Sequence, residues 1–210
     1  MDTVGHEQHI KSIIKLEERI GQCRRCPELI RCTSKPSLGK GDFEPEALLV
    51  FENDSKQTSN IKWIIELRNL IKKHFNIARV YHTYLMRCHP KSCISNHGND
   101  CCLPSKLVNR NNICLLNQQL CDGIPIKPSN EEIINCMYFL LEEIEVLKPQ
   151  YVILFGSRVE DFVLKSYGIF DSESNQQVYK YETTTILTTV EDNECKSDDI
   201  QRLARLIDMI

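Results

Sequence analysis

The sequence predicts an α/β protein, a three-layer sandwich with helices on both sides of a largely parallel central sheet. Two observations support this: apolar runs of strand length at 47–51 and 151–155, and amphipathic stretches of helical period between and around them. Strands that alternate with helices favour a parallel sheet, because the crossover helices then pack on the sheet. The length of 210 residues and the composition fit one globular domain, so we expect a single domain over residues 1–210.

The first half of the chain contains two helical and two strand patterns. Residues 7–20 and 61–74 each place isoleucines at helical spacing. The run 47–51 is continuously apolar, as in a strand that is buried on both faces. Residues 79–86 are rich in aromatic and apolar side chains and lead directly to Cys88. The predicted order is therefore helix, strand, helix, strand.

The second half continues this alternation, beginning with the helix whose ends are best defined. Ser129 followed by Glu132 fits a capping box, and Pro149 ends the helix predicted over 129–147. A strand, a helix, a strand and a last amphipathic helix then follow at 151–155, 158–166, 186–189 and 198–210. These elements supply enough helices to cover both faces of a sheet.

The composition is typical of a soluble intracellular protein. Hydrophobic residues make up 41% and charged residues 26%, which suits an ordinary globular core. No apolar run approaches the ~20 residues that span a bilayer, and the N-terminus lacks a signal-peptide pattern. Eleven cysteines fit metal ligation in a reducing compartment better than a closed disulfide framework. We therefore expect a cytoplasmic protein that does not contact membranes.

Four of the cysteines are placed like metal ligands. Cys23 and Cys26 form a CxxC turn, Cys88 follows a predicted strand, and Cys136 lies within a predicted helix. A CxxC pair alone does not separate zinc sites, redox motifs and iron-sulfur clusters. Thiolates gathered from distant segments suggest one buried metal site, with an iron-sulfur cluster and zinc as the alternatives.

The segments around these cysteines resemble those of a known family. In chain order they are IGQCRRCPELIRC from Ile20, ALLVFE from Ala47, VYHTYLMRCHP from Val80, EEIINC from Glu131 and LKPQYVILFG from Leu147. Their order and character resemble the iron-sulfur uracil-DNA glycosylases, family four of the uracil-DNA glycosylase superfamily, over roughly residues 20 to 170. The resemblance implies the fold of that superfamily and a 4Fe-4S cluster held by the four matching cysteines, Cys23, Cys26, Cys88 and Cys136.

The same resemblance assigns catalytic positions, and the chain departs from the family at most of them. Glu52 stands where the family has the acid that positions water, and Tyr84 stands where it has the asparagine that reads uracil. A phenol lacks the paired donor and acceptor of an amide. The family's His-Pro-Ser loop is replaced by acidic sequence around Glu191, and no histidine follows His97. These departures weigh against ordinary uracil excision.

The chain also carries an insertion relative to this family. There are 47 residues between Cys88 and Cys136, a much longer connection than the family has, and we place the insertion at about 93–128. Its cysteines are candidates for a second metal site, with zinc as the metal: Cys93, Cys101, Cys102, Cys114 and Cys121. The alternatives are a surface loop whose thiols are buried as small hydrophobes, and an element that binds a protein partner.

Basic residues are concentrated around the CxxC turn. Residues 11–40 contain eight basic and three acidic side chains, whereas residues 171–199 contain two basic and eight acidic ones. Phosphate contacts supply most non-specific nucleic-acid affinity, so the basic residues are candidate contacts to DNA or another nucleic acid: Arg24, Arg25, Arg31, Lys35 and Lys40. The alternative is that they balance the negative charge of a cluster. The net charge of −3 supports neither interpretation.

Two classes of function follow from the sequence. The first is a 4Fe-4S protein with a nucleic-acid-related role that has lost ordinary uracil excision and keeps the cluster as a structural element. The second is an active DNA glycosylase that removes uracil or another deaminated base in repair, with Glu52 as the acid and Tyr84 in the base pocket. The residues of the site separate these classes, because the fold is compatible with both. The sequence favours the first class and leaves catalysis open.

Overall fold

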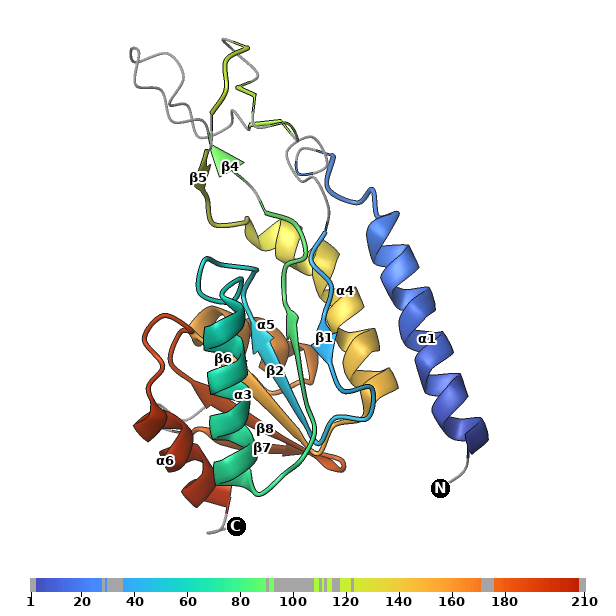
Figure 1. Ribbon diagram of the computed structural model, residues 1–210, viewed down its shortest axis with the longest axis vertical. Coiled ribbons are helices and arrows are strands. Elements are labelled where there is room, and N and C mark those ends of the chain that lie inside the picture. Colours follow the sequence, from blue (N-terminus) through green and yellow to red (C-terminus); the bar gives the residue numbers. More distant parts are fainter. Residues whose placement is uncertain are drawn as a thin grey trace.

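The computed structural model describes residues 3–27, 29, 36–89, 91–92, 108–109, 111, 113–114, 118–121, 123–170 and 176–207. Within these ranges, six strands form one sheet in the order β1-β3-β2-β6-β8-β7. Their bounds are Lys40–Gly41 (β1), Ala47–Phe51 (β2), Val80–Tyr84 (β3), Tyr151–Phe155 (β6), Val178–Tyr181 (β7) and Thr184–Thr189 (β8). The four central strands are parallel, and β1 and β7 pair antiparallel at the edges. The predicted α/β class with a largely parallel sheet is confirmed (Figure 1).

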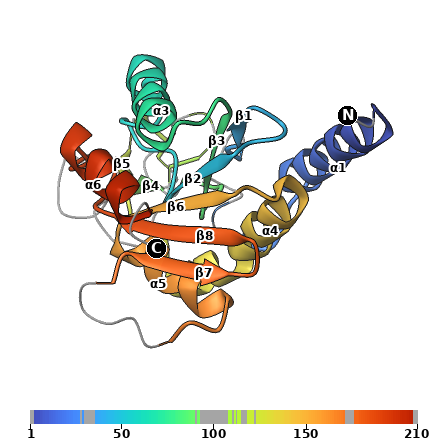
Figure 2. The same ribbon diagram turned by 90° about the horizontal axis from the view of Figure 1, so that it is seen from below.

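Helices cover both faces of this sheet (Figure 2). Their bounds are Thr3–Gly21 (α1), Ile61–Phe75 (α3), Asn130–Leu147 (α4), Ser157–Ser166 (α5) and Ser197–Ile207 (α6). α3 and α6 lie on one face, α4 and α5 lie on the other, and α1 packs along the outside of α4. Alternate side chains of β2 enter the two resulting cores: Leu48 and Val50 on the α4 side, Leu49 and Phe51 on the α3 side. A strand that is apolar at every position is therefore buried on both faces.

Helix ends agree with the local sequence signals. The predicted capping box of α4 is present: the Ser129 hydroxyl accepts from the backbone N–H of Glu132, whose carboxylate accepts from the backbone N–H of Ser129. Lys148 ends this helix in the left-handed conformation, one residue before Pro149. At the start of α3, the Asn60 side chain accepts from two backbone N–H groups.

The structure also contains strands that the sequence patterns did not indicate. β7 is one, and a short antiparallel pair formed by Lys91–Ser92 (β4) and Ile124–Pro125 (β5) is another. Most of the insertion at 93–128 lies outside the described residues, as do the last residues of the helix predicted to reach Ile210. No helix in the described part of the chain is long and apolar enough to cross a membrane.

The connections of β2 create a favourable place for a ligand. β2 lies between β3 and β6, and the chain passes first to β3 on one side and later to β6 on the other. In open α/β sheets, ligands bind beyond the carboxyl ends of the strands at such a reversal of strand order. Glu52 follows β2 directly, and Cys88 lies four residues after β3, so both belong to this end of the sheet.

Candidate functional site

The four predicted ligand cysteines line one cavity. Cys23 and Cys26 follow α1, Cys88 follows β3, and Cys136 lies in the second turn of α4. None of these four cysteines, all within the described residues, forms a disulfide. The remaining wall is mostly apolar, with Ile20, Leu29, Met86 and Phe139 among its side chains. The structure thus brings together the four residues that the resemblance assigned to a cluster.

In the ranges that the structure describes, no group of three or more His, Cys, Asp or Glu side chains is arranged to hold a metal ion. Burial raises the pKa of Cys26 to about 11, and the nearby Cys136 adds to the shift. Burial also raises the pKa of Cys136, against the opposing effect of the Arg87 backbone N–H. The metal-free thiols of Cys26 and Cys136 therefore stay protonated at neutral pH, and a metal would have to displace their protons.

Arg87 forms part of the same wall and is buried with its partner Glu143. Its Nη2 donates to Glu143 Oε2 at 2.5 Å, and each side chain is 2% exposed. Burial lowers the pKa of Arg87, but Glu143 outweighs this effect through its charge and hydrogen bond, so the net pKa is raised. Glu143 also accepts from Tyr81 Oη at 3.1 Å and from Thr83 Oγ1 at 2.5 Å. A cation is therefore fixed at the edge of the cysteine cavity.

The sequence patterns did not assign a role to either member of this pair, although a signal was present. Glu143 interrupts the apolar face of α4 between Leu140 and Leu147. A carboxylate on the buried face of a helix is costly unless it is paired, so it indicates a buried cation elsewhere. Arg87, next to Cys88, is that cation.

A second cavity contains Glu52. It is lined by residues 52–53 after β2, residues 125–127 after β5, the turn between β6 and α5, and residues 191–192 after β8. The β6–α5 turn depends on Gly156, which has φ of +93°, and a Cβ there would lie 3.0 Å from Glu191. The cavity thus occupies the carboxyl ends of β2, β6 and β8, where the reversal of strand order predicts a ligand.

Glu52 is held by Arg158, the first-turn arginine of α5. Arg158 Nη1 donates to Glu52 Oε1 at 2.7 Å. Its Nη2 donates to the Pro128 carbonyl at 2.5 Å and to Asn130 Oδ1 at 3.0 Å. One guanidinium therefore joins the candidate acid to the segment that leads into α4. Sequence reasoning did not select Arg158, because nothing in its local sequence distinguishes it from a surface arginine.

Tyr84 lies in the core and is not among the residues that line the Glu52 cavity. Its side chain is on the α3 side of the sheet, where its ring centroid is 6.4 Å from that of Phe51, and the residue is 2% exposed. Burial raises the pKa of Tyr84 to about 12, with the nearby Asp54 adding to the shift. The structure therefore does not bring Tyr84 and Glu52 together around one open pocket.

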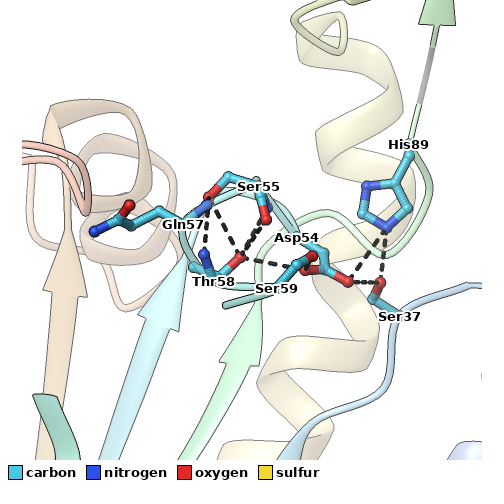
Figure 3. Close-up of polar contacts among 7 residues, drawn as sticks. All are labelled: Ser37, Asp54, Ser55, Gln57, Thr58, Ser59 and His89. Atoms are coloured by element: carbon cyan, nitrogen blue, oxygen red, sulfur yellow. Dashed lines mark hydrogen bonds and ion pairs between the residues drawn. The ribbon is translucent and has the colours of Figure 1, made fainter. Parts of the chain in front are cut away.

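The loop that follows Glu52 is tied to the Cys88 segment by polar side chains (Figure 3). Ser37 Oγ lies 2.7 Å from His89 Nε2 and donates to Asp54 Oδ2 at 3.0 Å. Asp54 also accepts from Ser59 Oγ at 2.6 Å. On the far side of the loop, Ser55 Oγ donates to Asp192 Oδ2 at 2.7 Å. This series of contacts runs from the residue after Cys88 to the wall of the Glu52 cavity.

The predicted nucleic-acid contacts are only partly described. Arg24 and Arg25 are exposed beside the cysteine cavity, and the Arg25 guanidinium lies 4.8 Å from the ring centroid of Tyr138. Lys40 is exposed on the edge strand β1. Arg31 and Lys35 lie outside the described residues. Two exposed arginines therefore lie next to the cavity, and the carboxylate of Glu132 also lies near Cys26.

The proposed second metal site is likewise only partly described. Cys114 is buried and packs with Val108 and Cys121 in a small apolar cluster. This packing matches the alternative in which thiols of the insertion act as small hydrophobes. Cys93, Cys101 and Cys102 lie outside the described residues, so the five cysteines cannot be placed as one set.

Comparison with known proteins identifies the superfamily. The family model of the uracil DNA glycosylase superfamily matches residues 62–198, which is more than half of the chain. The match includes Cys88 and Cys136 and begins after Glu52. No curated protein matches the sequence. The sheet, the cavity beyond its parallel strands and the family match agree, and the chain belongs to the uracil DNA glycosylase superfamily.

Proposed function

We propose that this protein is an iron-sulfur member of the superfamily that binds nucleic acid and has lost ordinary uracil excision. The observation that carries the proposal is the shared cavity of Cys23, Cys26, Cys88 and Cys136. Three segments far apart in the sequence supply these thiols, so a cluster there would join α1, the end of β3 and α4. The cluster would act as a structural element of the fold.

The donor set and its surroundings fit a 4Fe-4S cluster. Such clusters are held by four cysteine thiolates, and four thiols line this cavity. Arg87 supplies a buried positive charge to an anionic group, and its backbone N–H donates to Cys136 Sγ at 3.3 Å. Hydrogen bonds to sulfur and nearby charge are the means by which proteins adjust such clusters.

Zinc is the alternative metal, because four thiolates suit either metal. A single zinc ion requires its sulfur ligands about 2.3 Å from one point. In a 4Fe-4S cluster each thiolate binds a different iron, so the four sulfurs need only surround a larger group. The resemblance of the four cysteine segments to the iron-sulfur family favours the cluster.

The proposed nucleic-acid role is supported by membership of the superfamily and by the exposed Arg24 and Arg25 next to the cavity. The acidic side chains Glu191 and Asp192 line the other cavity, where they would repel a phosphate backbone. We therefore place the contact with nucleic acid on the side of the cysteines.

The environment of Glu52 supports the loss of uracil excision. Cleavage of the glycosidic bond requires hydrogen-bond donors for the departing uracil anion and an amide that reads the base. Glu191 and Asp192 occupy the region of the family's His-Pro-Ser loop, and ionised carboxylates only accept hydrogen bonds. Tyr84, in place of the amide, is buried in the core. Loss of even one preorganised donor costs ~2.7–4 kcal/mol, or roughly a hundredfold to a thousandfold in rate.

One observation favours a second candidate function, the removal of another deaminated base. Glu52 lines a cavity at the place where α/β proteins bind ligands, and Arg158 holds its carboxylate in position. A carboxylate held in this way can orient an attacking water. In this second candidate, Glu52 is still the acid that positions water, and the substrate is a deaminated base other than uracil.

The cluster is tested by metal analysis of anaerobically purified protein. We expect a brown protein with about four irons and four acid-labile sulfides per chain. Cys88→Ala or Cys136→Ala should remove the colour and lower stability, whereas Cys195→Ala, at a free cysteine that does not line the cavity, should keep the iron. A colourless protein with stoichiometric zinc at these four cysteines would refute the cluster.

The nucleic-acid role is tested by a salt titration of DNA binding beside a single-turnover excision assay on uracil, hypoxanthine and xanthine substrates. We expect salt-sensitive binding without uracil release, and Arg24→Ala should reduce the salt slope by about 1. Arg205→Ala, an exposed arginine on α6, is the matched control. Efficient uracil release that Glu52→Gln abolishes would contradict the proposal, and release of another base would establish the second candidate. If the protein neither binds nucleic acid nor excises a base, the function would instead lie with a protein partner of the 93–128 insertion.

A further inference from the structure

Arg87 has hydrogen-bonding capacity that its described surroundings do not use. Nη2 binds Glu143, but Nε and Nη1 are buried and have no hydrogen-bond partner among the described residues. A buried donor without an acceptor destabilises the folded state, and a charged donor does so more strongly. The fold would keep such a group only where something compensates it.

The position of Arg87 indicates what this compensation is. Arg87 lines the cysteine cavity and is next to Cys88 in sequence. Its backbone N–H already donates to the Cys136 sulfur. The positive charge of Arg87 would therefore stabilise an anionic group in the cavity. The sulfur acceptors of such a group could also accept hydrogen bonds from Nε and Nη1.

Glu143 is held by three buried donors. Its carboxylate accepts from Tyr81, Thr83 and Arg87. The fit is close, because a Cβ at Gly39 would overlap the Tyr81 ring and lie 2.7 Å from Glu143 Oε1. Arg87 is among the residues that line the cysteine cavity, and Glu143 is not.

We propose that Arg87 and Glu143 together set the reduction potential of the cluster in the cysteine cavity. The inference rests on the proposed function, since it requires that the cavity holds a 4Fe-4S cluster. Uptake of one electron from a low-potential reductant such as dithionite makes the cluster and its four thiolates more negative. Arg87 favours this form and raises the potential, while Glu143 lowers it by partly neutralising Arg87. The effect is strong because both side chains are shielded from water and salt.

The two charges predict shifts of opposite sign, which a purely structural pair would not produce. Glu143→Gln keeps hydrogen-bonding atoms and removes the negative charge, so the midpoint potential should move to more positive values. Arg87→Gln removes the positive charge, and the midpoint should move to more negative values. Arg87→Lys keeps the charge and should stay nearest to the wild type. Loss of charge at a shielded position is the common cause of both shifts.

The chain offers a matched control. Arg19 and Glu142 form an ion pair at 2.5 Å between α1 and α4, with side chains 44% and 25% exposed. Glu142 is the neighbour of Glu143 in sequence, but water and salt screen its pair. Arg19→Gln and Glu142→Gln should therefore leave the midpoint potential within experimental error of the wild type.

The experiment is a redox titration of the intact, iron-loaded protein and these variants, followed by electron paramagnetic resonance, with iron content measured first. Wild-type protein without iron would refute the proposed function, and this inference with it. Iron-loaded protein in which Glu143→Gln leaves the midpoint unchanged, or lowers it, would overturn the inference alone. If Arg87→Gln fails to fold or to load iron, the midpoint potentials of Glu143→Gln and Arg87→Lys test the inference. A cluster that dithionite reduces in neither the wild type nor Glu143→Gln also counts against the inference.

Discussion

Arg158 and Glu52 form an ion pair at 2.7 Å although 106 residues separate them in the sequence. Glu52 follows β2, and Arg158 lies in the first turn of the helix after β6. Because β2 and β6 are parallel neighbours, their carboxyl ends bring the two side chains together. The pair closes one side of the Glu52 cavity.

Replacing Arg158 should destabilise the protein more than loss of a surface ion pair would. Arg158→Met removes the bond to Glu52 and two bonds to Pro128 and Asn130, so we expect a loss of about 1–2 kcal/mol in the free energy of unfolding. Urea denaturation measures this loss. Arg202→Met is the control, since Arg202 pairs only at 3.5 Å with Asp199 on its own helix, and its effect should be within about 0.5 kcal/mol. Equal losses in the two variants would contradict the linking role of Arg158.

Ser37 should hold the loop after Glu52 in place. Ser37→Ala removes the contacts to His89 and Asp54, and we expect faster amide hydrogen exchange in residues 52–60 with a stability loss of about 1–2 kcal/mol. Ser12→Ala removes a partly exposed serine of α1 whose hydroxyl donates to the Gln8 carbonyl, and it should leave exchange in this loop unchanged. Unaltered exchange in Ser37→Ala would show that the loop is held by other contacts.

His82 should make the fold sensitive to moderate acid. Burial lowers the pKa of His82 to about 3, and the neighbouring Arg68 adds to the shift. Between pH ~6.5 and ~3 the unfolded chain therefore binds a proton at this position that the folded protein does not. Stability then falls as the pH is lowered, by up to ~1.4 kcal/mol per pH unit from this group.

Urea unfolding at several pH values between about 7 and 5 measures this dependence. His82→Gln keeps an acceptor for Arg68 and cannot take up a proton, so its stability should fall less steeply with acid than that of the wild type. Ser12→Ala, which changes no titratable group, should keep the wild-type slope. A wild-type slope in His82→Gln would mean that other groups cause the acid sensitivity.

The insertion cysteines should be dispensable for iron. The cavity contains four thiols without them, so replacing Cys93, Cys101, Cys102, Cys114 and Cys121 together with serine should leave the iron content nearly unchanged. Some loss of stability is expected from Cys114, which is 1% exposed. Loss of iron on replacement would show that the ligands are wrongly assigned, and loss of zinc alone would support a second metal site.

The helices and central strands of this fold were predictable because their signals are local. The capping box of Ser129 and Glu132 marks the start of α4, and the runs at 47–51 and 151–155 coincide with β2 and β6. Edge strand β7 was missed. Its exposed Lys180 breaks the apolar pattern, and its strand conformation depends on pairing with β8.

For the candidate site, the sequence by itself determined which residue types are available and the tertiary structure decided which of them meet. The order of the segments around Cys23, Cys26, Cys88 and Cys136 predicted a common site, and these thiols line one cavity. Local sequence carries no information on partners 56 or 106 residues away, so the pairs of Arg87 with Glu143 and of Glu52 with Arg158 emerged only from the packing of strands and helices. The packing of strands and helices also determines which face of the sheet the Tyr84 side chain occupies. Alternation along β3 and the packing of α3 place it in the core beside Phe51, because a strand side chain can point to only one side of the sheet.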